Sequence, residues 1–248
     1  MIKALIFDVD GTLADTERDG HRVAFNLAFA DAGLDWNWSV DIYEDLLSVT
    51  GGKERMRFYL EKYQVPAPDV EDLAGYIAEL HKAKTAHYTR LLSEGKIPLR
   101  PGVERLLNEA RANDMRLAIA TTTTPANVTA LLENTLGAES LDWFEVIAAG
   151  DIVPAKKPAP DIYNWALEKM SLKPEDVVAF EDSENGIISV RDAGIGKCVI
   201  TINEYTKHHN FSGATVVLDQ LGEESSPAKV ISGSMSDAYV TLDTILKL

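Results

Sequence analysis

The chain has 248 residues, 46% of them hydrophobic, which is enough for one large globular domain or two small ones. Its 24 basic and 39 acidic residues give a net charge of −15, which argues against nonspecific binding to nucleic acids or anionic membranes. The only cysteine is Cys198, so an internal disulfide is excluded, and no apolar run is long enough for a transmembrane helix.

Strand and helix patterns can be followed along the chain. The first strand is predicted at about residues 3–8, and helical patterns follow near 16–32, 40–48, 53–63 and 70–93. After Pro101 we predict strands at 116–120, 144–148, 177–180, 197–201 and 216–218. Helices are predicted over 103–113, from residue 160, over 183–193 and over 237–247, and Thr124-Pro125 is typical of a helix start. Residues 222–236 are small and polar and are predicted to form a surface loop.

Alternating strands and helices indicate an α/β fold with a doubly wound, Rossmann-like parallel sheet that helices cover on both faces. Residues 15–95 carry helical patterns only, and Pro98 to Gly102 mark the end of this stretch. We therefore expect an all-helical domain of residues 15–95 inserted into a core of residues 1–14 and 96–248. No signal peptide pattern is present, so a cytoplasmic location is expected, or the plastid stroma if a transit peptide was removed.

The segment Asp8-Val9-Asp10-Gly11-Thr12 directly follows the first apolar strand. Its two carboxylates therefore lie at the carboxyl end of a strand, where open α/β sheets bind their ligands. In such a pair one carboxylate can attack a phosphorus atom while the other handles a proton, and the pair can also serve a metal ion. The structural alternative is an Asp-rich turn after a strand, which is common.

Three further segments follow or adjoin predicted strands. Thr121-Thr122-Thr123 offers a hydroxyl and an amide that can bind phosphate oxygens, although it also fits a helix N-cap. Lys157 lies in a proline-rich, extended loop, where it could also be a solvated side chain. Glu181-Asp182 is an acidic pair that suits Mg²⁺, although an N-capping Asp or Ser without a metal would look the same. Their common position at strand ends favours one shared site.

In this order, the four segments resemble the four motifs of the haloacid dehalogenase-like (HAD) phosphatases, and the resemblance covers the whole core. The resemblance implies that Asp8 is the nucleophile and forms an aspartyl-phosphate. It implies that Asp10 protonates the leaving alcohol and later activates water. Mg²⁺ would be held by Asp8, the backbone carbonyl of Asp10, and Asp182, with Glu181 orienting its neighbours.

The resemblance also assigns the residues that hold the phosphoryl group. Thr121, the amide of Thr122, and Lys157 would bind its oxygens. Phosphoryl transfer depends mostly on positioning and charge stabilisation, so hydroxyl, amide and ammonium donors are suitable groups.

A second resemblance lies in the helical insert, which is similar to the C1-type cap of β-phosphoglucomutase-like HAD proteins. Within this insert, several segments resemble the CbbY family: Thr16-Glu17, His21, Asp35-Trp36-Asn37-Trp38, Tyr43 and the stretch Thr50 to Arg55. Members of that family dephosphorylate xylulose 1,5-bisphosphate, a misfire product and inhibitor of rubisco in the Calvin cycle. The resemblance therefore implies a small phosphorylated sugar as substrate.

A bisphosphate needs a receptor for the phosphate that does not react. Gly51 and Gly52 allow backbone amides to approach an anion, Lys53 adds a point charge, and the following helix adds a favourable dipole. Glu17 and His21 are four residues apart on one helix face and could bind sugar hydroxyls, and Tyr43 is a further candidate. The structural alternatives are a simple glycine turn, a solvated lysine and a surface Glu–His pair.

Three functions are considered from the sequence. The first is a Mg²⁺-dependent sugar bisphosphate phosphatase, and the second is a sugar phosphomutase of the β-phosphoglucomutase type, which would use the same catalytic residues. The third is a binding module without catalysis, but this would predict the loss of an acid, and Asp8, Asp10, Lys157 and Asp182 are all present. We also expect a monomer that binds neither nucleic acid nor membrane.

Overall fold

The computed structural model describes residues 2–49 and 51–248. It divides into two compact units, one of Met1–Asp15 with Pro98–Leu248 and the other of Thr16–Ile97. We call them the core unit and the helical unit. Thr50, part of the stretch that resembles the CbbY family, lies outside the described residues.

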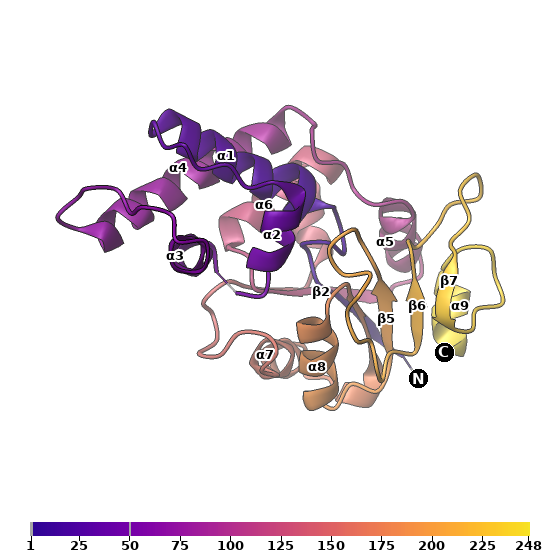
Figure 1. Ribbon diagram of the computed structural model, residues 1–248. Helices are drawn as coiled ribbons and strands as arrows, with labels where there is room; N and C mark the ends of the chain where they lie inside the picture. The colour runs from indigo at the N-terminus through magenta and orange to yellow at the C-terminus, as the bar shows by residue number, and fades with distance from the viewer. Residues whose placement is uncertain (1, 50) are drawn as a thin grey trace. The chain divides into compact units, whose positions relative to one another are not determined.

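The core unit contains a seven-stranded sheet in the order β3-β2-β1-β4-β5-β6-β7 (Figure 1). Every neighbouring pair is parallel except β6 and β7, which are antiparallel. The expected α/β fold with a doubly wound sheet is therefore confirmed. The strands are β1 (Ala4–Phe7), β2 (Arg116–Thr121), β3 (Val146–Ala149), β4 (Val177–Glu181), β5 (Cys198–Thr201), β6 (Val216–Leu218) and β7 (Val230–Gly233).

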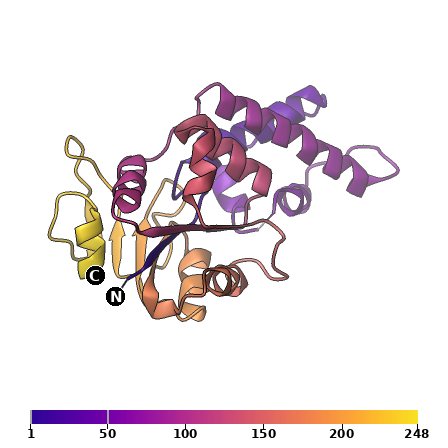
Figure 2. The same cartoon turned by 180° about the vertical axis from the view of Figure 1, so that it is seen from behind.

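Helices cover both faces of this sheet (Figures 1 and 2). Ala4 and Ile6 of β1 belong to a core cluster with α7 and α8, whereas Leu5 and Phe7 point to the opposite face, where α5 and α6 pack. Burial on both faces explains why the strands are continuous apolar runs rather than alternating ones. The helices of this unit are α5 (Val103–Ala112), α6 (Pro125–Leu136), α7 (Asp161–Met170), α8 (Glu184–Asp192) and α9 (Leu242–Lys247), with short 3₁₀ turns at Ala138–Trp143 and Pro174–Asp176.

Two predictions near the C-terminus were wrong in detail. The expected loop of residues 222–236 contains the edge strand β7, and the last helix begins at Leu242 instead of residue 237. All residues of β7 are exposed, so its sequence lacks the buried apolar run that marks the other strands. The helix begins late because the Thr241 hydroxyl caps it by accepting a hydrogen bond from the Thr244 amide.

The helical unit contains α1 (Arg22–Asp31), α2 (Val40–Leu46), α3 (Gly52–Lys62) and α4 (Leu73–Ser93). The single helix expected over 16–32 begins instead with a π-helical turn, η1 (Glu17–His21). Aromatic side chains form much of the interior, with Phe25 and Phe29 of α1 packed against Trp38. None of the helices in the described residues combines the length and apolarity needed to cross a bilayer.

Candidate active site

The strand order brings the chemically interesting segments of the core unit together. β1 lies between β2 and β4, so the direction of winding reverses at β1, and ligands of such sheets bind outside the carboxyl ends at this point. Asp8 follows β1, Thr121 ends β2, and Glu181 ends β4. The prediction that these segments meet at strand ends agrees with this topology.

Lys157 is the centre of the buried polar cluster. Its Nζ donates to Asp8 Oδ1 at 2.7 Å, to Glu181 Oε1 at 2.5 Å and to the carbonyl of Ala120 at 2.9 Å. The Tyr163 hydroxyl also donates to Glu181 Oε1, at 2.6 Å. Lys157 is only 7% exposed, so it is not the solvated loop lysine of the alternative interpretation. Glu181 thus positions the ammonium group that lies on Asp8.

The cluster holds an excess of negative charge. Asp8, Glu181 and Asp182 bring three carboxylates against the one ammonium of Lys157, and all four side chains are buried. Burial, followed by the other carboxylates, raises the pKa of Asp182 well above its ordinary range. Burial raises the pKa of Asp8 to about 7, even though Lys157 pulls it down. Burial by itself would lower the pKa of Lys157. The attraction of the Asp8 and Glu181 carboxylates outweighs this effect, so the pKa of the Lys157 ammonium is raised.

This donor set fits a hard divalent cation. Carboxylate oxygens of Asp8, Glu181 and Asp182 lie within 4.8 Å of one another, and Mg²⁺ binds oxygen ligands and offsets two negative charges. Glu181 accepts hydrogen bonds from Lys157, Tyr163 and the amide of Asp182. Among the described residues, fewer donors reach Asp8 or Asp182, so these two carboxylates are the less engaged pair.

Asp182 is held from one side by an amide. Asn203 Nδ2 donates to Asp182 Oδ2 at 2.7 Å, and Asn203 Oδ1 accepts the Tyr205 N–H, so the orientation of the amide is set. Gly11 makes room for this contact: a Cβ on Gly11 would lie 2.2 Å from Asp182 Oδ2, and its φ of +81° also favours glycine.

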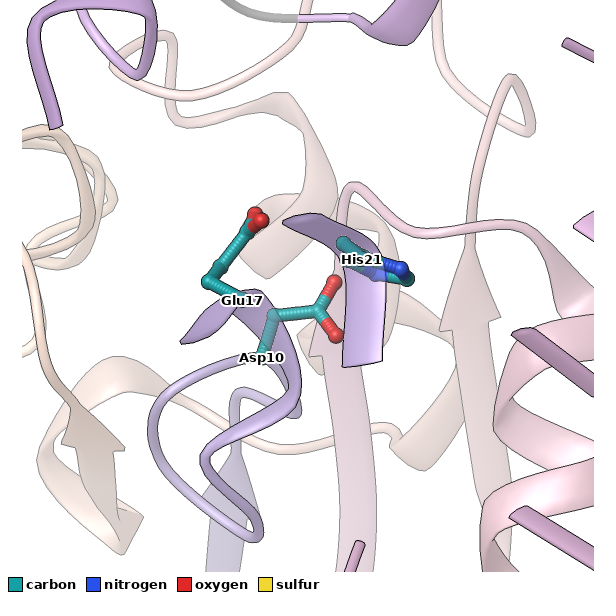
Figure 3. Close-up of side chains that lie close together, drawn as sticks. All are labelled: Asp10, Glu17 and His21. Carbon is teal, nitrogen blue, oxygen red and sulfur yellow. The ribbon is translucent and has the colours of Figure 1, made fainter. Parts of the chain in front are cut away.

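The remaining predicted residues of the core unit are close to their strand ends. Thr121 is buried, and its hydroxyl accepts the Thr123 amide at 3.3 Å. Thr122 is half-buried, while Thr124 caps α6 by accepting the Asn127 amide. Asp10 is half-buried in the turn after β1 (Figure 3). The N-cap of α6 is therefore Thr124, and neither the Thr121 hydroxyl nor the Thr122 amide takes part in capping that helix.

In the helical unit, Glu17 belongs to a polar network. The Tyr43 hydroxyl donates to Glu17 Oε2 at 2.5 Å, and Arg55 donates to the Tyr43 oxygen at 2.9 Å. Arg55 also lies 3.4 Å from Glu17 Oε2 and donates through Nε to the carbonyl of Val49. This network ties α2 and α3 to η1, from which both Glu17 and His21 extend (Figure 3).

His21 is buried rather than a surface residue. Its Nδ1 lies 2.9 Å from the Nζ of Lys84, which is itself only 5% exposed. The ring of His21 packs against Tyr88, and the Lys84 ammonium lies over the rings of Phe25 and Tyr88. The surface Glu–His pair is therefore excluded for His21.

Gly51, Gly52 and Lys53 form the start of α3. Gly51 has a φ of +103°, and Lys53 is exposed. A Cβ on Gly52 would lie 2.6 Å from the His81 ring, so this helix start is seated directly on α4. Burial, assisted by Lys84, Lys53 and His21, lowers the pKa of His81 to about 4.

Several residues of these clusters were not predicted from the sequence, although two of them carried a signal. Lys84 was not among the predicted residues, although its spacing from the buried residues Ile77, Leu80, Tyr88 and Leu92 places it on the inner face of α4. Asn203 carried a signal too, because it is a polar residue just beyond the end of β5. For Arg100 the sequence indicated only a place in the segment that ends the helical insert.

Comparison with known proteins identifies the class. Residues 2–194 match the haloacid dehalogenase-like hydrolase family. Over 227 residues the chain is 49% identical to Protein CbbY of Rhodobacter capsulatus, covering 92% of this chain and 97% of that one. The chain therefore belongs to the haloacid dehalogenase-like hydrolases and, within them, to the CbbY family, and it is an enzyme of the phosphoric monoester hydrolase type.

Two solved structures extend this comparison. One is a variant of CbbY from Rhodobacter sphaeroides in complex with xylulose 1,5-bisphosphate; it is 45% identical, covers 91% of this chain and 98% of its own, and has a TM-score of 0.81. The other is a putative β-phosphoglucomutase from Thermotoga maritima, 26% identical over 87% of this chain and 94% of its own, with a TM-score of 0.67.

Proposed function

We propose that this enzyme is a Mg²⁺-dependent sugar bisphosphate phosphatase that converts xylulose 1,5-bisphosphate to xylulose 5-phosphate through an aspartyl-phosphate. The observation that carries the proposal is the buried contact of Lys157 with Asp8 and Glu181, beside Asp182. The R. sphaeroides CbbY variant with bound xylulose 1,5-bisphosphate supports the choice of substrate.

The chemistry is divided between the first two aspartates. A carboxylate oxygen of Asp8 attacks the phosphorus, and the bond from phosphorus to the sugar oxygen breaks while Asp10 gives that oxygen a proton. Water then attacks the aspartyl-phosphate, Asp10 takes a proton from it, and the bond between phosphorus and Asp8 breaks. Asp8 and Asp10 end the cycle in their starting protonation states.

Donors around Asp8 hold the transferring group. Lys157, the Thr121 hydroxyl and the Thr122 amide bind phosphoryl oxygens, and Glu181 and Tyr163 keep the ammonium of Lys157 in place. Asp8, the carbonyl of Asp10, and Asp182 would hold Mg²⁺, which supplies positive charge against the repulsion between a carboxylate and a phosphate.

The helical unit contributes the specificity for a bisphosphate. Gly51, Gly52 and Lys53 bind the phosphate that does not react, through amides and the exposed ammonium. Glu17, His21 and Tyr43 bind sugar hydroxyls. Because Tyr43 and Arg55 both contact Glu17, these groups are held in fixed orientations within the unit.

A phosphomutase is the second candidate, supported by the similarity to a putative β-phosphoglucomutase. A phosphatase passes the phosphoryl group to water, whereas a mutase returns one to a sugar hydroxyl. The experiment is a phosphate-release screen with xylulose 1,5-bisphosphate, ribulose 1,5-bisphosphate and β-glucose 1-phosphate side by side. Preferential release from xylulose 1,5-bisphosphate supports our proposal. An isomeric monophosphate formed from β-glucose 1-phosphate without phosphate release would support the mutase instead.

A further inference from the structure

Arg100 is a buried cation of the core unit that the proposed chemistry does not use. It is 7% exposed and donates to four backbone carbonyls: those of Gly11, Thr201, Ile202 and Asp219. The distances to Ile202 and Asp219 are 2.6 and 2.7 Å, and Asp15 lies 3.5 Å away. One guanidinium thus joins three loops that are far apart in sequence.

Two of these loops, the turn that contains Gly11 and the segment that contains Ile202, lie beside the acidic cluster. Gly11 belongs to the turn that carries Asp8 and Asp10, and a side chain at Gly11 would collide with both Asp182 and Asn203. Ile202 directly precedes Asn203, whose amide donates to Asp182 at 2.7 Å. The carbonyls that Arg100 binds are therefore next to the groups that set the position of Asp182.

The amide of Asn203 has no freedom to turn over. Its Oδ1 accepts the Tyr205 N–H at 2.9 Å, and its backbone N–H donates to the Thr206 hydroxyl at 3.0 Å. Only the NH₂ group can therefore face Asp182. With Arg100 holding the preceding carbonyl, the whole of residues 201–203 is fixed relative to the first acidic turn.

We propose that Arg100 is a positioning residue that, through Ile202 and Asn203, fixes the Asp182 carboxylate for the metal ion. The inference rests on the proposed function, because it assumes that Asp182 holds Mg²⁺. Partners that orient metal ligands typically account for about 10–100-fold in metal affinity. A planar guanidinium suits this task because its donors form a rigid fork, which a lysine cannot reproduce.

The chain offers a matched control in Arg105. This arginine also ties loops together, since it donates to the carbonyls of Gly222 and Val240 at 2.9 and 2.7 Å. Its other partners, Glu109 and Glu223, belong to α5 and to the loop after β6 rather than to the acidic cluster. Loss of the guanidinium group of Arg105 should lower the stability of the fold but leave the Mg²⁺ affinity unchanged.

The experiment compares Arg100→Lys, Asn203→Ala, the double variant and Arg105→Lys with the wild-type enzyme. Mg²⁺ binding is measured by calorimetry, the Mg²⁺ requirement with an aryl phosphate, and the melting temperature without metal. We expect Arg100→Lys and Asn203→Ala each to weaken Mg²⁺ binding about 10–100-fold. The double variant should lose much less than the product of the two, since both act on Asp182. Arg105→Lys should lower the melting temperature and leave Mg²⁺ binding unchanged.

Other outcomes overturn the inference. Wild-type Mg²⁺ affinity in Asn203→Ala and Arg100→Lys would refute it while leaving the proposed function intact. An equal loss in Arg105→Lys would mean that any loosened loop weakens the site. A wild-type enzyme that neither binds nor needs Mg²⁺ would refute the proposed function, and this inference with it. If Arg100→Lys does not fold, wild-type Mg²⁺ affinity in Asn203→Ala still overturns the inference, because Arg100 is proposed to act through Asn203.

Discussion

Asp8 and Asp10 are two residues apart, yet their surroundings differ. Asp8 is buried and bonded to Lys157, whereas Asp10 is half-buried in the following turn. A carboxylate whose orientation is fixed by a neighbouring ammonium is suited to attack a phosphorus atom along a defined line. A carboxylate in a more open turn can exchange protons with a leaving group and with water. This difference in environment is what the two proposed tasks of Asp8 and Asp10 require.

Asp8→Asn keeps the shape of the side chain but removes the attacking oxygen and one charge. Hydrolysis should fall by several orders of magnitude, because the covalent route is lost. The fold should survive, since the buried cluster contains more carboxylates than ammonium groups. Steady-state kinetics and a melting curve check both points. Turnover near the wild-type rate would contradict the role of Asp8.

Asp10→Asn tests the proton transfer. A sugar alkoxide is a poor leaving group and needs a proton, whereas an aryl oxide leaves with little help. The variant should therefore lose much more activity on a sugar phosphate than on an aryl phosphate. Parallel assays of the two substrates at the same Mg²⁺ concentration measure this ratio. Equal losses on both substrates would argue that Asp10 is not the acid.

Lys53→Ala tests specificity. Lys53 is exposed, so its removal should leave the melting temperature unchanged. Loss of one charge-assisted hydrogen bond should cost about 1.5–3 kcal/mol, or roughly tenfold to more than a hundredfold in kcat/KM for the bisphosphate. An aryl phosphate has no second phosphate and should react normally. Arg57→Ala, another exposed cation of α3, is the control and should change neither reaction. An equal loss on both substrates in Lys53→Ala would refute its role as a phosphate receptor.

At the level of secondary-structure elements, the start of α3 depends on α4. Gly52 lies against the His81 ring, and a single methyl group there would be 2.6 Å from it. The ring of Phe25 in α1 fills the same space, because its Cζ would lie 2.9 Å from a Cβ on Gly52. The absence of a side chain at Gly52 is therefore a packing requirement of this helix start, whatever it binds.

His81 should make the stability of this unit depend on pH. Its pKa is lowered from 6.5 to about 4 in the folded state, so between these values the unfolded chain binds a proton that the folded chain does not. The free energy of unfolding should therefore decrease as the pH falls from 6.5 towards 4, and change little through His81 above 6.5. Denaturant titrations of the wild type and His81→Gln over pH 4–7 isolate this contribution. The difference in the free energy of unfolding between the two proteins should change between pH 6.5 and 4 and stay constant from pH 6.5 to 7, and a difference that does not vary with pH would contradict this role of His81.

At the level of the whole molecule, the net charge of −15 opposes an anionic substrate, and the site itself is acidic. In the proposed function, three local positive charges offset this field: Lys157 in the core unit, Lys53 in the helical unit, and the metal ion. Because the carboxylates of Asp8 and Asp182 are buried, we expect a metal ion held by them to contribute to folding as well as to the proposed chemistry.

Removal of the metal should therefore have two effects. Excess chelator should abolish hydrolysis, and added Mg²⁺ should restore it, whereas Ca²⁺ should restore little because its coordination is looser. Mg²⁺ at about 100 times its dissociation constant should also stabilise the fold by about 2.7 kcal/mol. Melting curves with and without Mg²⁺ measure this, and the shift should be absent in Asp182→Ala. Full activity in chelator would rule out the metal.

Short local patterns in the sequence were sufficient for much of the fold. Continuous apolar runs predicted six of the seven strands, because each is buried on both faces. Parallel strands end at the same edge of a sheet, so the sequence motifs could be proposed to form one site. These motifs are Asp8 to Thr12, Thr121 to Thr123, Lys157 and Glu181-Asp182. The roles of these residues, and those of Glu17, His21, Tyr43 and Gly51 to Lys53, stay predictions.

Other features depend on neighbours that are distant in sequence. β7 forms because β6 offers an unpaired edge, and its own exposed residues carry no signal. Lys84 is buried because His21, Phe25 and Tyr88 surround its ammonium, and Arg100 is buried because four carbonyls from three loops receive its donors. The sequence determined which groups are available for chemistry. Only the tertiary structure decided which of them are partners, because hydrogen bonds and charge pairs form between atoms that folding brings within about 3 Å.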